Sequence, residues 1–599
     1  MFERIAPLKP YLRRYRKELA WGGVAVVLYN TIKVLLPLVI GHAVDDMRSG
    51  VTQQKIVFHA LRLMGVAALS AVFLFLTRQI IIGASREIEY DIRNDLFSNL
   101  ERQSAAFYQT HRTGDIMART TNDLAAVRQL LGPAIMYSAN TIVFTAAALP
   151  FMIRISPRLT MLAVVPLPIA SVFIQAFGAR IHKRFERIQA MFSDISAKAQ
   201  ENFSGARLIR AFAQEQAEIA SFETANQEYI GRSLHLVRLM AMLWPSLEFV
   251  LGLSMVITLL VGGHQVINHR ITVGQFAEFM VYMVQLTWPM IAIGWVVNLF
   301  QRGTASVIRI DELLKQQPSI VDESDSAVAS SVHLGGGSPE SASLPVPPTL
   351  AGEIIFRNLT FAYNDAAPVL KDINLTIPAG TSLAIVGPTG SGKSTLVSLI
   401  ARLYDAAPGS VLIDSHPIRQ IPLQALRRQI GFVPQETFLF SDTVAHNVSF
   451  GEPSATQQQV EDAASIAHIR TEILEFPKGF QTLVGERGVT LSGGQKQRTA
   501  IARAVLRDPR ILILDDALAS VDTYTEEQIL TGLREVMQGR TTVFISHRIS
   551  TARNADRIAV LVDGRIAELG THDELIARNG YYTRLDEKQR LEEELAVAQ

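Results

Sequence analysis

The first half of the chain carries six apolar segments, each close to the length that crosses a lipid bilayer. They lie at about 21–44, 57–83, 134–155, 159–180, 239–263 and 273–300. A helix needs about 20 predominantly apolar residues to cross about 30 Å of hydrocarbon. The segments therefore predict an α-helical membrane domain of six transmembrane helices.

These spans are interrupted by charged residues and prolines. Lys33, Glu248 and Glu278 fall inside or at the edges of spans, and prolines occur at positions 37, 166, 168, 245 and 289. Membrane helices tolerate such prolines when neighbouring groups satisfy the freed carbonyls. An ionisable group that faces lipid is costly, so we expect Glu248 and Gln285 to lie near a cavity. There they would meet substrate or water, and Glu248 could equally pair with another polar group in the helix bundle.

The connections between the spans differ in length and charge. Those near 45–56, 156–158 and 264–272 are short, whereas 84–133 and 181–238 are long, polar and rich in arginine and lysine. Together with the basic N-terminus, this asymmetry places both termini and both long loops in the cytoplasm. Helical apolar spacing continues through 105–131 and 188–229, so the long loops are expected to extend the spanning helices as cytoplasmic hairpins.

Composition divides the rest of the chain. Residues 316–350 are rich in Ser, Gly, Pro and acidic residues, which predicts a flexible linker between a membrane domain at 1–315 and a second domain at 351–599. The net charge of +1, from 57 basic and 56 acidic residues, argues against a nucleic-acid partner. The absence of cysteine excludes disulfides, thiolate metal sites and cysteine nucleophiles.

The second domain contains a phosphate-binding loop. A strand-like apolar run, Ser382 to Val386, leads into Gly387, Pro388, Thr389, Gly390, Ser391, Gly392, Lys393, Ser394 and Thr395. This order of strand, GxxxxGK[ST] loop and apolar helix predicts an ATP site. Backbone N–H groups would surround the phosphates, Lys393 would reach the β- and γ-phosphates, and the Ser394 hydroxyl would meet Mg²⁺. A second apolar strand, 511–515, ends in Asp515, a carboxylate for the metal.

A further motif lies between these two, formed by Leu491, Ser492, Gly493, Gly494 and Gln495. With it, nearly the whole chain resembles an exporter half-transporter of the ATP-binding cassette (ABC) superfamily, in which six spans precede one nucleotide-binding domain. The resemblance implies that Tyr363 stacks on adenine, that Gln435 contacts metal and water, and that His547 is the switch histidine. It also implies that 485–488 contacts an intracellular loop and that 519–522 forms the D-loop.

The resemblance implies a second chain as partner. In the family, two cassettes close head to tail, with ATP between the phosphate loop of one and the 491–495 segment of the other. Closure would pull on the cytoplasmic hairpins, whose docking turns we expect near 113–119 and 204–209. An inward-open cavity would thereby become outward-open, and ATP hydrolysis would reset it.

One residue departs from the family pattern. Active cassettes follow the strand-end aspartate with a glutamate that acts as general base, whereas here Asp515 is followed by Asp516. The loss of one methylene retracts the carboxylate by about 1.5 Å. A general base must approach the water to within roughly 2.6–3.2 Å. We therefore predict that this site binds ATP and hydrolyses it slowly, as in the degenerate-site subunit of a heterodimeric exporter.

Other functions remain open at this stage. The chain could form a homodimeric exporter with slow ATPase, or an ATP-gated channel or regulator on the same scaffold. An importer is disfavoured, because importers of this superfamily usually carry the two domains on separate chains. The resemblance implies an amphipathic or lipid-like substrate, but drug, lipid and peptide exporters share these motifs, so the motifs do not identify the substrate. The expected location is a bacterial inner membrane, with the ATPase domain in the cytoplasm.

Overall fold

The computed structural model describes residues 5–322, 349–364, 366–485, 491–519, 521 and 523–597. Most of the predicted linker, 323–348, lies outside the described residues. The chain divides into two compact units. The helical unit comprises Met1–Arg102 and His111–Gln317, and the α/β unit comprises Gln103–Thr110 and Pro318–Gln599.

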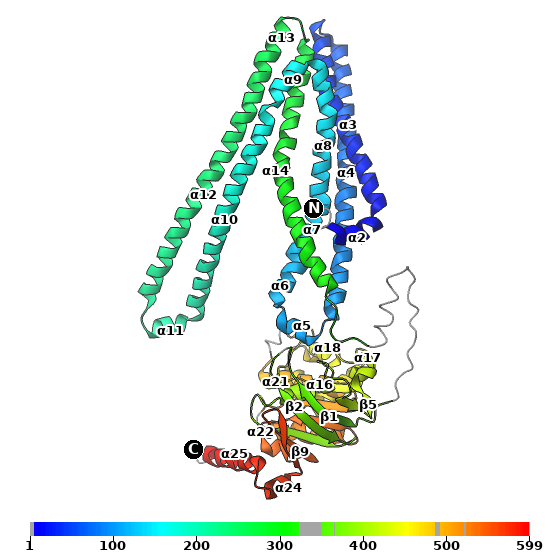
Figure 1. Ribbon diagram of the computed structural model, residues 1–599, viewed down its shortest axis with the longest axis vertical. Coiled ribbons are helices and arrows are strands. Elements are labelled where there is room, and N and C mark those ends of the chain that lie inside the picture. Colours follow the sequence, from blue (N-terminus) through cyan, green and yellow to red (C-terminus); the bar gives the residue numbers. More distant parts are fainter. Residues whose placement is uncertain are drawn as a thin grey trace. The chain divides into compact units, whose positions relative to one another are not determined.

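Long helices build the helical unit (Figure 1). They are α3 (Arg16–Arg48), α4 (Gln53–Glu101), α8 (Ile135–Ile155), α10 (Pro166–Ser204), α12 (Glu215–Ile257) and α14 (Val273–Lys315). Shorter helices join or extend them: α2 (Lys9–Arg14), α6 (Thr113–Ala118), α7 (Leu124–Gln129), α9 (Pro157–Val164), α11 (Ala206–Ala211) and α13 (Gly263–Ile267). The predicted helical membrane domain is confirmed.

Five stretches of the described helices are long and apolar enough to cross a membrane. They are Arg16–Arg48, Gln53–Glu101, Thr113–Ile155, Glu215–Ile267 and Val273–Lys315. The remaining predicted span, 159–180, falls on α9 and the first part of α10, where several side chains are outside those the structure describes. Helix α4 alone has 49 residues, and at about 1.5 Å per residue it is more than twice as long as the hydrocarbon is thick. The helices therefore continue beyond the membrane, as the hairpin prediction requires.

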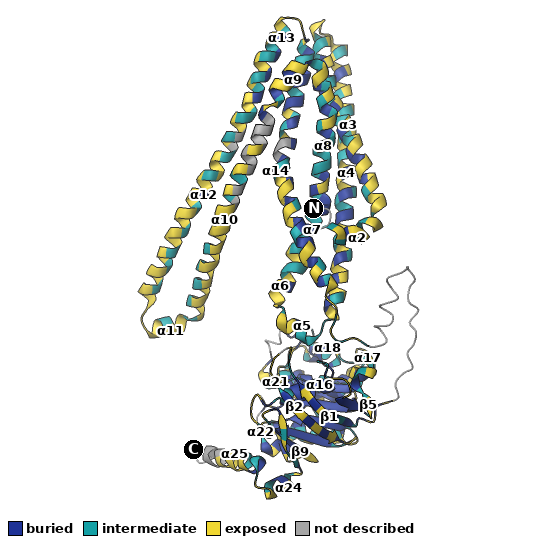
Figure 2. Ribbon diagram, in the orientation of Figure 1, coloured by how far each residue is buried: buried dark blue, intermediate teal, exposed yellow. Residues whose placement is uncertain are grey.

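The helices of this unit are buried to very different degrees. A cluster of buried apolar side chains joins α3, α8 and α14, and includes Phe144, Met152, Phe279 and Tyr282. Helices α10 and α12 pack against each other and are exposed over most of their length toward α11 (Figure 2). Among the interrupting charges, Lys33 places its Nζ 4.7 Å from the ring centroid of Phe144 and Glu278 is buried, whereas Glu248 is exposed.

Two sheets organise the α/β unit. The first sheet has the order β2-β1-β4-β5, made of β1 (Ile354–Phe361), β2 (Leu370–Ile377), β4 (Val411–Ile413) and β5 (His416–Pro417). The second has the order β10-β9-β3-β8-β7-β6, made of β3 (Ser382–Val386), β6 (Ile430–Val433), β7 (Ile511–Asp515), β8 (Thr541–Ile545), β9 (Arg557–Val562) and β10 (Arg565–Gly570). The described helices of this unit are α5 (Ala105–Thr110), α16 (Lys393–Ile400), α17 (Leu423–Arg428), α18 (Val444–Ser449), α19 (Gln457–Ile466), α20 (Arg470–Glu475), α21 (Gly493–Leu506), α22 (Thr523–Met537), α23 (Ile549–Ala552), α24 (His572–Ala577) and α25 (Tyr581–Val597).

The order of the second sheet brings the nucleotide motifs to one edge. Strands β3, β8, β7 and β6 are adjacent and parallel. The phosphate loop follows β3, His547 lies two residues beyond β8, Asp515 ends β7, and Gln435 lies two residues beyond β6. Ligands of open α/β sheets bind at the carboxyl ends of the strands. Strands β3, β7 and β8 are buried throughout, as expected for parallel strands covered on both faces.

A short segment of the first long loop belongs to the α/β unit. Within it, Gln109 on α5 donates a hydrogen bond from Nε2 to the hydroxyl of Tyr404 at 2.7 Å. The docking turn predicted near 113–119 stays a prediction: Arg119 belongs to the helical unit and donates to the carbonyl of Arg309 on α14. Apolar spacing predicted the helices but not that Gln103–Thr110 belongs to the α/β unit. The second turn, near 204–209, coincides with exposed α11 and stays a prediction.

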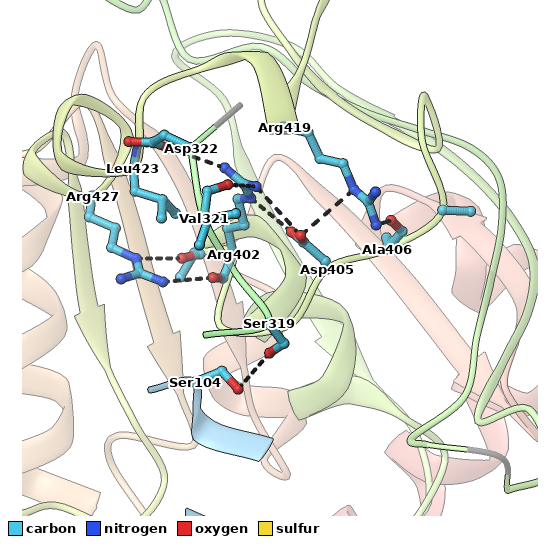
Figure 3. A network of polar contacts seen from close by, with 12 residues as sticks. Ser104, Ser319, Val321, Asp322, Arg402, Asp405, Ala406, Arg419, Leu423 and Arg427 are labelled. Atoms are coloured by element: carbon cyan, nitrogen blue, oxygen red, sulfur yellow. Dashed lines mark hydrogen bonds and ion pairs between the residues drawn. The ribbon is translucent and has the colours of Figure 1, made fainter. Parts of the chain in front are cut away.

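Residues 318–322, which follow α14, form hydrogen bonds within the α/β unit (Figure 3). Arg402, only 2% exposed, donates to the carbonyl of Val321 at 3.1 Å and to Asp405 at 2.7 Å. Asp322 accepts a hydrogen bond from the backbone N–H of Leu423 at 2.9 Å. Ser319 bonds to Ser104 at 2.8 Å. Residues 318–322, which composition assigned to the linker, are thus built into the folded unit.

Candidate ATP site

A cavity of about 240 Å³ lies at the carboxyl edge of the parallel strands. Its lining residues are Val369, Thr389, Gly390, Gly392, Lys393, Ser394, Thr395, Gln435, Asp515, Asp516, Ile545 and His547. The fold thus gathers the phosphate loop, both aspartates, the glutamine and the histidine around one space. These side chains come from four neighbouring strand ends, which explains how residues more than 150 positions apart in sequence meet.

The phosphate loop has a backbone that only glycine adopts easily. Gly387, Gly390 and Gly392 have φ values of 148°, 81° and 100°. A Cβ atom on Gly387 would lie 2.1 Å from the carbonyl oxygen of Leu561, so any side chain there would collide with β9. Gly392 directly precedes α16. A tight glycine loop that ends at a helix N-terminus presents backbone N–H groups to an anion.

Lys393 supplies a buried positive charge beside this loop. It is 6% exposed, and its Nζ donates to the carbonyls of Gly387 at 3.0 Å and Pro388 at 2.8 Å. Burial lowers the pKa of Lys393, and the charges of Asp516 and Asp515 act against this shift. Its bonds to neutral carbonyls can be exchanged for stronger bonds to phosphate oxygens.

Ser394 and Asp515 form the adjoining oxygen-rich part of the site. The Ser394 hydroxyl donates to Asp515 Oδ1 at 2.9 Å, and Asp515 is 5% exposed. Burial raises the pKa of Asp515, the Ser394 hydrogen bond lowers it, and the nearby charge of Asp516 raises it. Among the described residues, no group of three or more His, Asp or Glu side chains could hold a metal by itself. Ser394, Gln435 and Asp515 instead fit Mg²⁺, which is usually held by one or two carboxylates together with substrate phosphates and water.

Asp516 and His547 face each other across the same cavity. Asp516 has a left-handed backbone with φ 49°, and its side chain is 13% exposed. Its Oδ2 lies 4.0 Å from Nε2 of His547. Aspartate tolerates this backbone better than most residues. The pair places one carboxylate and one imidazole side by side in the lining of the cavity that contains the phosphate loop.

Tyr363 lies beside the loop but not in the lining of the cavity. Its hydroxyl shares a hydrogen bond of 2.9 Å with Thr395 Oγ1. Its ring meets that of Tyr404 edge to face, with centroids 5.0 Å apart. Tyr404 in turn accepts the hydrogen bond from Gln109 on α5. The sequence analysis missed Val369, Tyr404 and Gln109, because none of them belongs to a local motif.

The five residues from Leu491 to Gln495 are not among the described residues that line this cavity. Ser492 caps α21: its Oγ accepts from Gln495 N at 3.2 Å, and Gln495 Oε1 accepts from Ser492 N at 2.9 Å. Leu491 is buried, whereas Ser492 and Gly493 are exposed. The first N–H groups of a helix have no partner within it, so this exposed start can donate to an anion.

Several predicted contacts lie outside the described residues. These are Glu486, Arg487 and Gly488 of the predicted loop contact, and Ser520 and Asp522 of the predicted D-loop. Two neighbours, Ala519 and Val521, are described, and Val521 is buried.

Comparison with known proteins decides the family. A model described as "ABC transporter transmembrane region" matches residues 19–290, and one described as "ABC transporter" matches residues 370–519. The chain belongs to the ABC transporter family. It is a multi-pass membrane exporter with a fused ATPase domain whose activity is coupled to transport.

Relatives match this ABC exporter over most of its length. The chain is 35% identical to a probable multidrug resistance ABC transporter ATP-binding/permease protein of Bacillus subtilis, covering 99% of this chain and 98% of that protein. It is 38% identical to an ATP-dependent lipid A-core flippase of Syntrophus aciditrophicus, covering 85% and 82%. A solved structure of a bacterial Atm1-family ABC exporter with ATP bound matches with a TM-score of 0.73 at 28% identity, covering 96% and 98%. Half-transporters of this kind dimerise, so one chain is half of the functional transporter.

Proposed function

We propose that this exporter subunit contributes the slow ATP site of a heterodimer that moves an amphipathic or lipid-like substrate out across a bacterial inner membrane. The observation that carries the proposal is Asp516, which stands at the cavity where the family pattern has the longer glutamate. Its carboxylate keeps the charge but lacks about 1.5 Å of reach. A general base contributes typically 10²–10⁴ in rate, so a carboxylate held too far back gives slow hydrolysis.

In this proposal each residue of the site keeps its sequence-derived role. Tyr363 stacks on adenine, and the loop from Gly387 to Thr395 surrounds the phosphates with Lys393 as the fixed cation. Ser394, Gln435 and Asp515 hold Mg²⁺, which neutralises negative charge on the phosphates. His547 contacts the γ-phosphate, and Gln435 helps to orient water. The 491–495 segment serves ATP bound by the partner chain.

The substrate class rests on the relatives and on one cavity. The relatives' names refer to multidrug resistance and to lipid A-core flipping. A cavity of about 290 Å³ lies between α12 and α14, with mainly apolar lining that includes Leu251, Met255 and Met283. Ser254 and Thr287 add hydroxyl groups to it. Such a lining suits the apolar part of an amphipathic molecule. In this proposal both termini and the ATPase domain face the cytoplasm.

Two variants of the proposal use the same scaffold. A homodimer with two slow sites would have low basal ATPase in the chain purified alone. An ATP-gated channel or regulator would pass substrate downhill for longer than hydrolysis continues. The heterodimeric exporter is favoured because the 491–495 segment matches the family pattern, whereas the side chain of Asp516 is one methylene shorter than the glutamate of that pattern.

A pair of variants tests the asymmetry by steady-state phosphate release from the complex that co-purifies with the tagged chain. Ser492→Ala should reduce turnover strongly, because it removes a charge-assisted hydrogen bond worth about 1.5–3 kcal/mol at the partner's site. Asp516→Asn should change turnover little, because the short carboxylate contributes little to it. Abolished turnover in Asp516→Asn, or rapid hydrolysis by the chain alone as a homodimer, would show that Asp516 is an adequate base.

A further inference from the structure

The turn that carries His547 has few backbone bonds of its own. It spans only Ser546 to Arg548, between the end of β8 and the start of α23. Ser546 closes it locally: its Oγ accepts from Arg548 N at 3.0 Å and donates to Arg548 O at 3.1 Å. At its ends, Ser546 N donates to the carbonyl of Ile385 at 3.4 Å and Arg548 O accepts from Ala552 N at 3.2 Å. Among the described residues no such backbone–backbone bond involves His547 itself, so these bonds do not set the direction of its imidazole. Its direction therefore depends on groups that reach the turn from elsewhere.

Helix α22 holds one side of this turn. Glu526, 4% exposed, accepts hydrogen bonds from the Arg548 guanidinium and from the Thr551 hydroxyl. Arg548 also donates to the carbonyl of Val521 at 3.5 Å. These bonds fix the residue after His547 and the first turn of α23. None of them acts on the backbone of His547 itself.

Gln589 on α25 holds the other side and bonds to His547 directly. Its Nε2 donates to the carbonyl of His547 at 2.5 Å, and its Oε1 accepts from the N–H of Ile549 at 2.8 Å. The orientation of the amide is fixed by its partners, because a carbonyl can only accept and an N–H can only donate. One side chain thus spans the turn and satisfies the first N–H of α23, which has no partner within that helix.

Helix α25 is itself firmly attached, so that Gln589 reaches the turn from a fixed support. At its start, Glu568 accepts from the N–H of Tyr582 at 3.2 Å. The Tyr582 side chain is fully buried, and its hydroxyl bonds to His572 at 2.9 Å. Thr583 donates to the carbonyl of Leu575 at 3.1 Å. Gln589 lies about two helical turns beyond these anchors.

We propose that Gln589 is a positioning residue for the nucleotide site, which it serves by fixing the backbone of His547. The proposal rests on the role of His547 at the γ-phosphate given above. Gln589 is not itself among the residues that line the cavity, and it reaches the site through the backbone of His547. Loss of its two hydrogen bonds lets the 546–548 turn move, so the imidazole is no longer held near Asp516. The last described helix of the chain thereby helps to determine how long ATP stays bound.

The test measures release of ATP from this chain's own phosphate loop. The complex is loaded with radiolabelled 8-azido-ATP, chased with unlabelled ATP, and irradiated at intervals, and the two subunits are separated by size so that label on this chain is counted alone. Gln589→Met keeps length and helix propensity but removes both polar atoms. It should speed release several-fold, close to the rate of His547→Ala. The double variant should be no faster than His547→Ala, because both changes act through the same imidazole.

Glu587→Met is the matched control, since Glu587 is an exposed residue on the same helix. It should leave release and melting temperature unchanged. If Gln589→Met lowers the melting temperature but not the retention of ATP, its role is only structural and the inference is overturned. Additive effects with His547→Ala would overturn it as well. If His547→Ala itself leaves release unchanged, the proposed role of the histidine fails first, and the experiment shows this separately.

Discussion

The phosphate-loop cavity and the exposed start of α21 both contain a helix N-terminus, yet they are built in opposite ways. At the cavity, glycines with positive φ turn the chain around a cation that is 6% exposed, beside two carboxylates. At α21, an ordinary capping box holds an uncharged, exposed Ser492. The first region can hold a ligand within one chain. In the proposed heterodimer the second serves a nucleotide bound by the other chain, so defects in the two regions should separate in different assays.

The largest expected effect comes from Lys393→Ala. The variant loses the fixed ammonium at the phosphate loop, and a charge-assisted hydrogen bond is worth about 1.5–3 kcal/mol, or roughly ten- to hundredfold in affinity. Photolabelling of this chain by an azido nucleotide should fall accordingly. Ser492→Ala is the comparison variant and should leave labelling of this chain's own loop in place. Equal loss in both variants would mean that the two regions do not act separately.

A smaller effect is expected from replacing Arg498, a buried residue of α21. Arg498 bonds to Glu472 at 2.6 Å and to the carbonyl of His468 at 2.7 Å, and its side chain is 10% exposed. Arg498→Met removes these bonds and should lower the stability by about 2 kcal/mol, discounted for the partial exposure of Glu472. We expect reduced ATPase of the complex with normal nucleotide labelling of this chain.

Melting temperature and phosphate release, measured on the same preparation, check this second prediction. Lys496→Met on the same helix is the matched control, because no described ion pair involves Lys496. It should melt and hydrolyse like the unmodified protein. Lost nucleotide labelling in Arg498→Met would show that the support of α21 also shapes the phosphate loop.

The smallest effect is expected in the predicted linker. Deleting about ten residues within 325–341 should leave transport nearly unchanged, because the free energy of closing a flexible loop depends only weakly on its length. Vesicle transport by a normally expressed deletion variant measures this. Neither the phosphate loop nor α21 lies in this segment, so nucleotide labelling serves as the control. Abolished transport would assign the segment a specific role.

Sequence patterns predicted best those features that are encoded by residues contiguous in the chain. The phosphate loop and the 491–495 segment are contiguous motifs, and the strand order of an α/β sheet then brings Gln435, Asp515 and His547 to the same edge. Long apolar runs are equally local and predicted the helical domain. The membership of Gln103–Thr110 in the α/β unit was not predicted, because the helical spacing of 105–131 does not change where this segment ends. Only the partner, Tyr404, singles out Gln109, and it lies 295 residues away.

Gln589 illustrates what sequence patterns could not show. It stands in a charged helix with no motif around it, and its bonds go to backbone atoms of His547 and Ile549, whose identities leave no trace in the sequence. The short carboxylate of Asp516 was visible only because a family pattern existed to compare it with. Contacts to backbone groups and contacts between distant segments are therefore the part that required the structure.

The attachment of residues 318–322 has a consequence for cleavage of the chain. The chain enters the 323–348 segment from Asp322, held by Leu423, and leaves it at Leu350, whose N–H donates to Gln429 at 2.8 Å. The residues on both sides of the 323–348 segment therefore bond to the same α/β unit. The N-terminal piece also supplies α5 to that unit. A chain cleaved within this segment would therefore still have α5 and residues 318–322 bonded to the α/β unit.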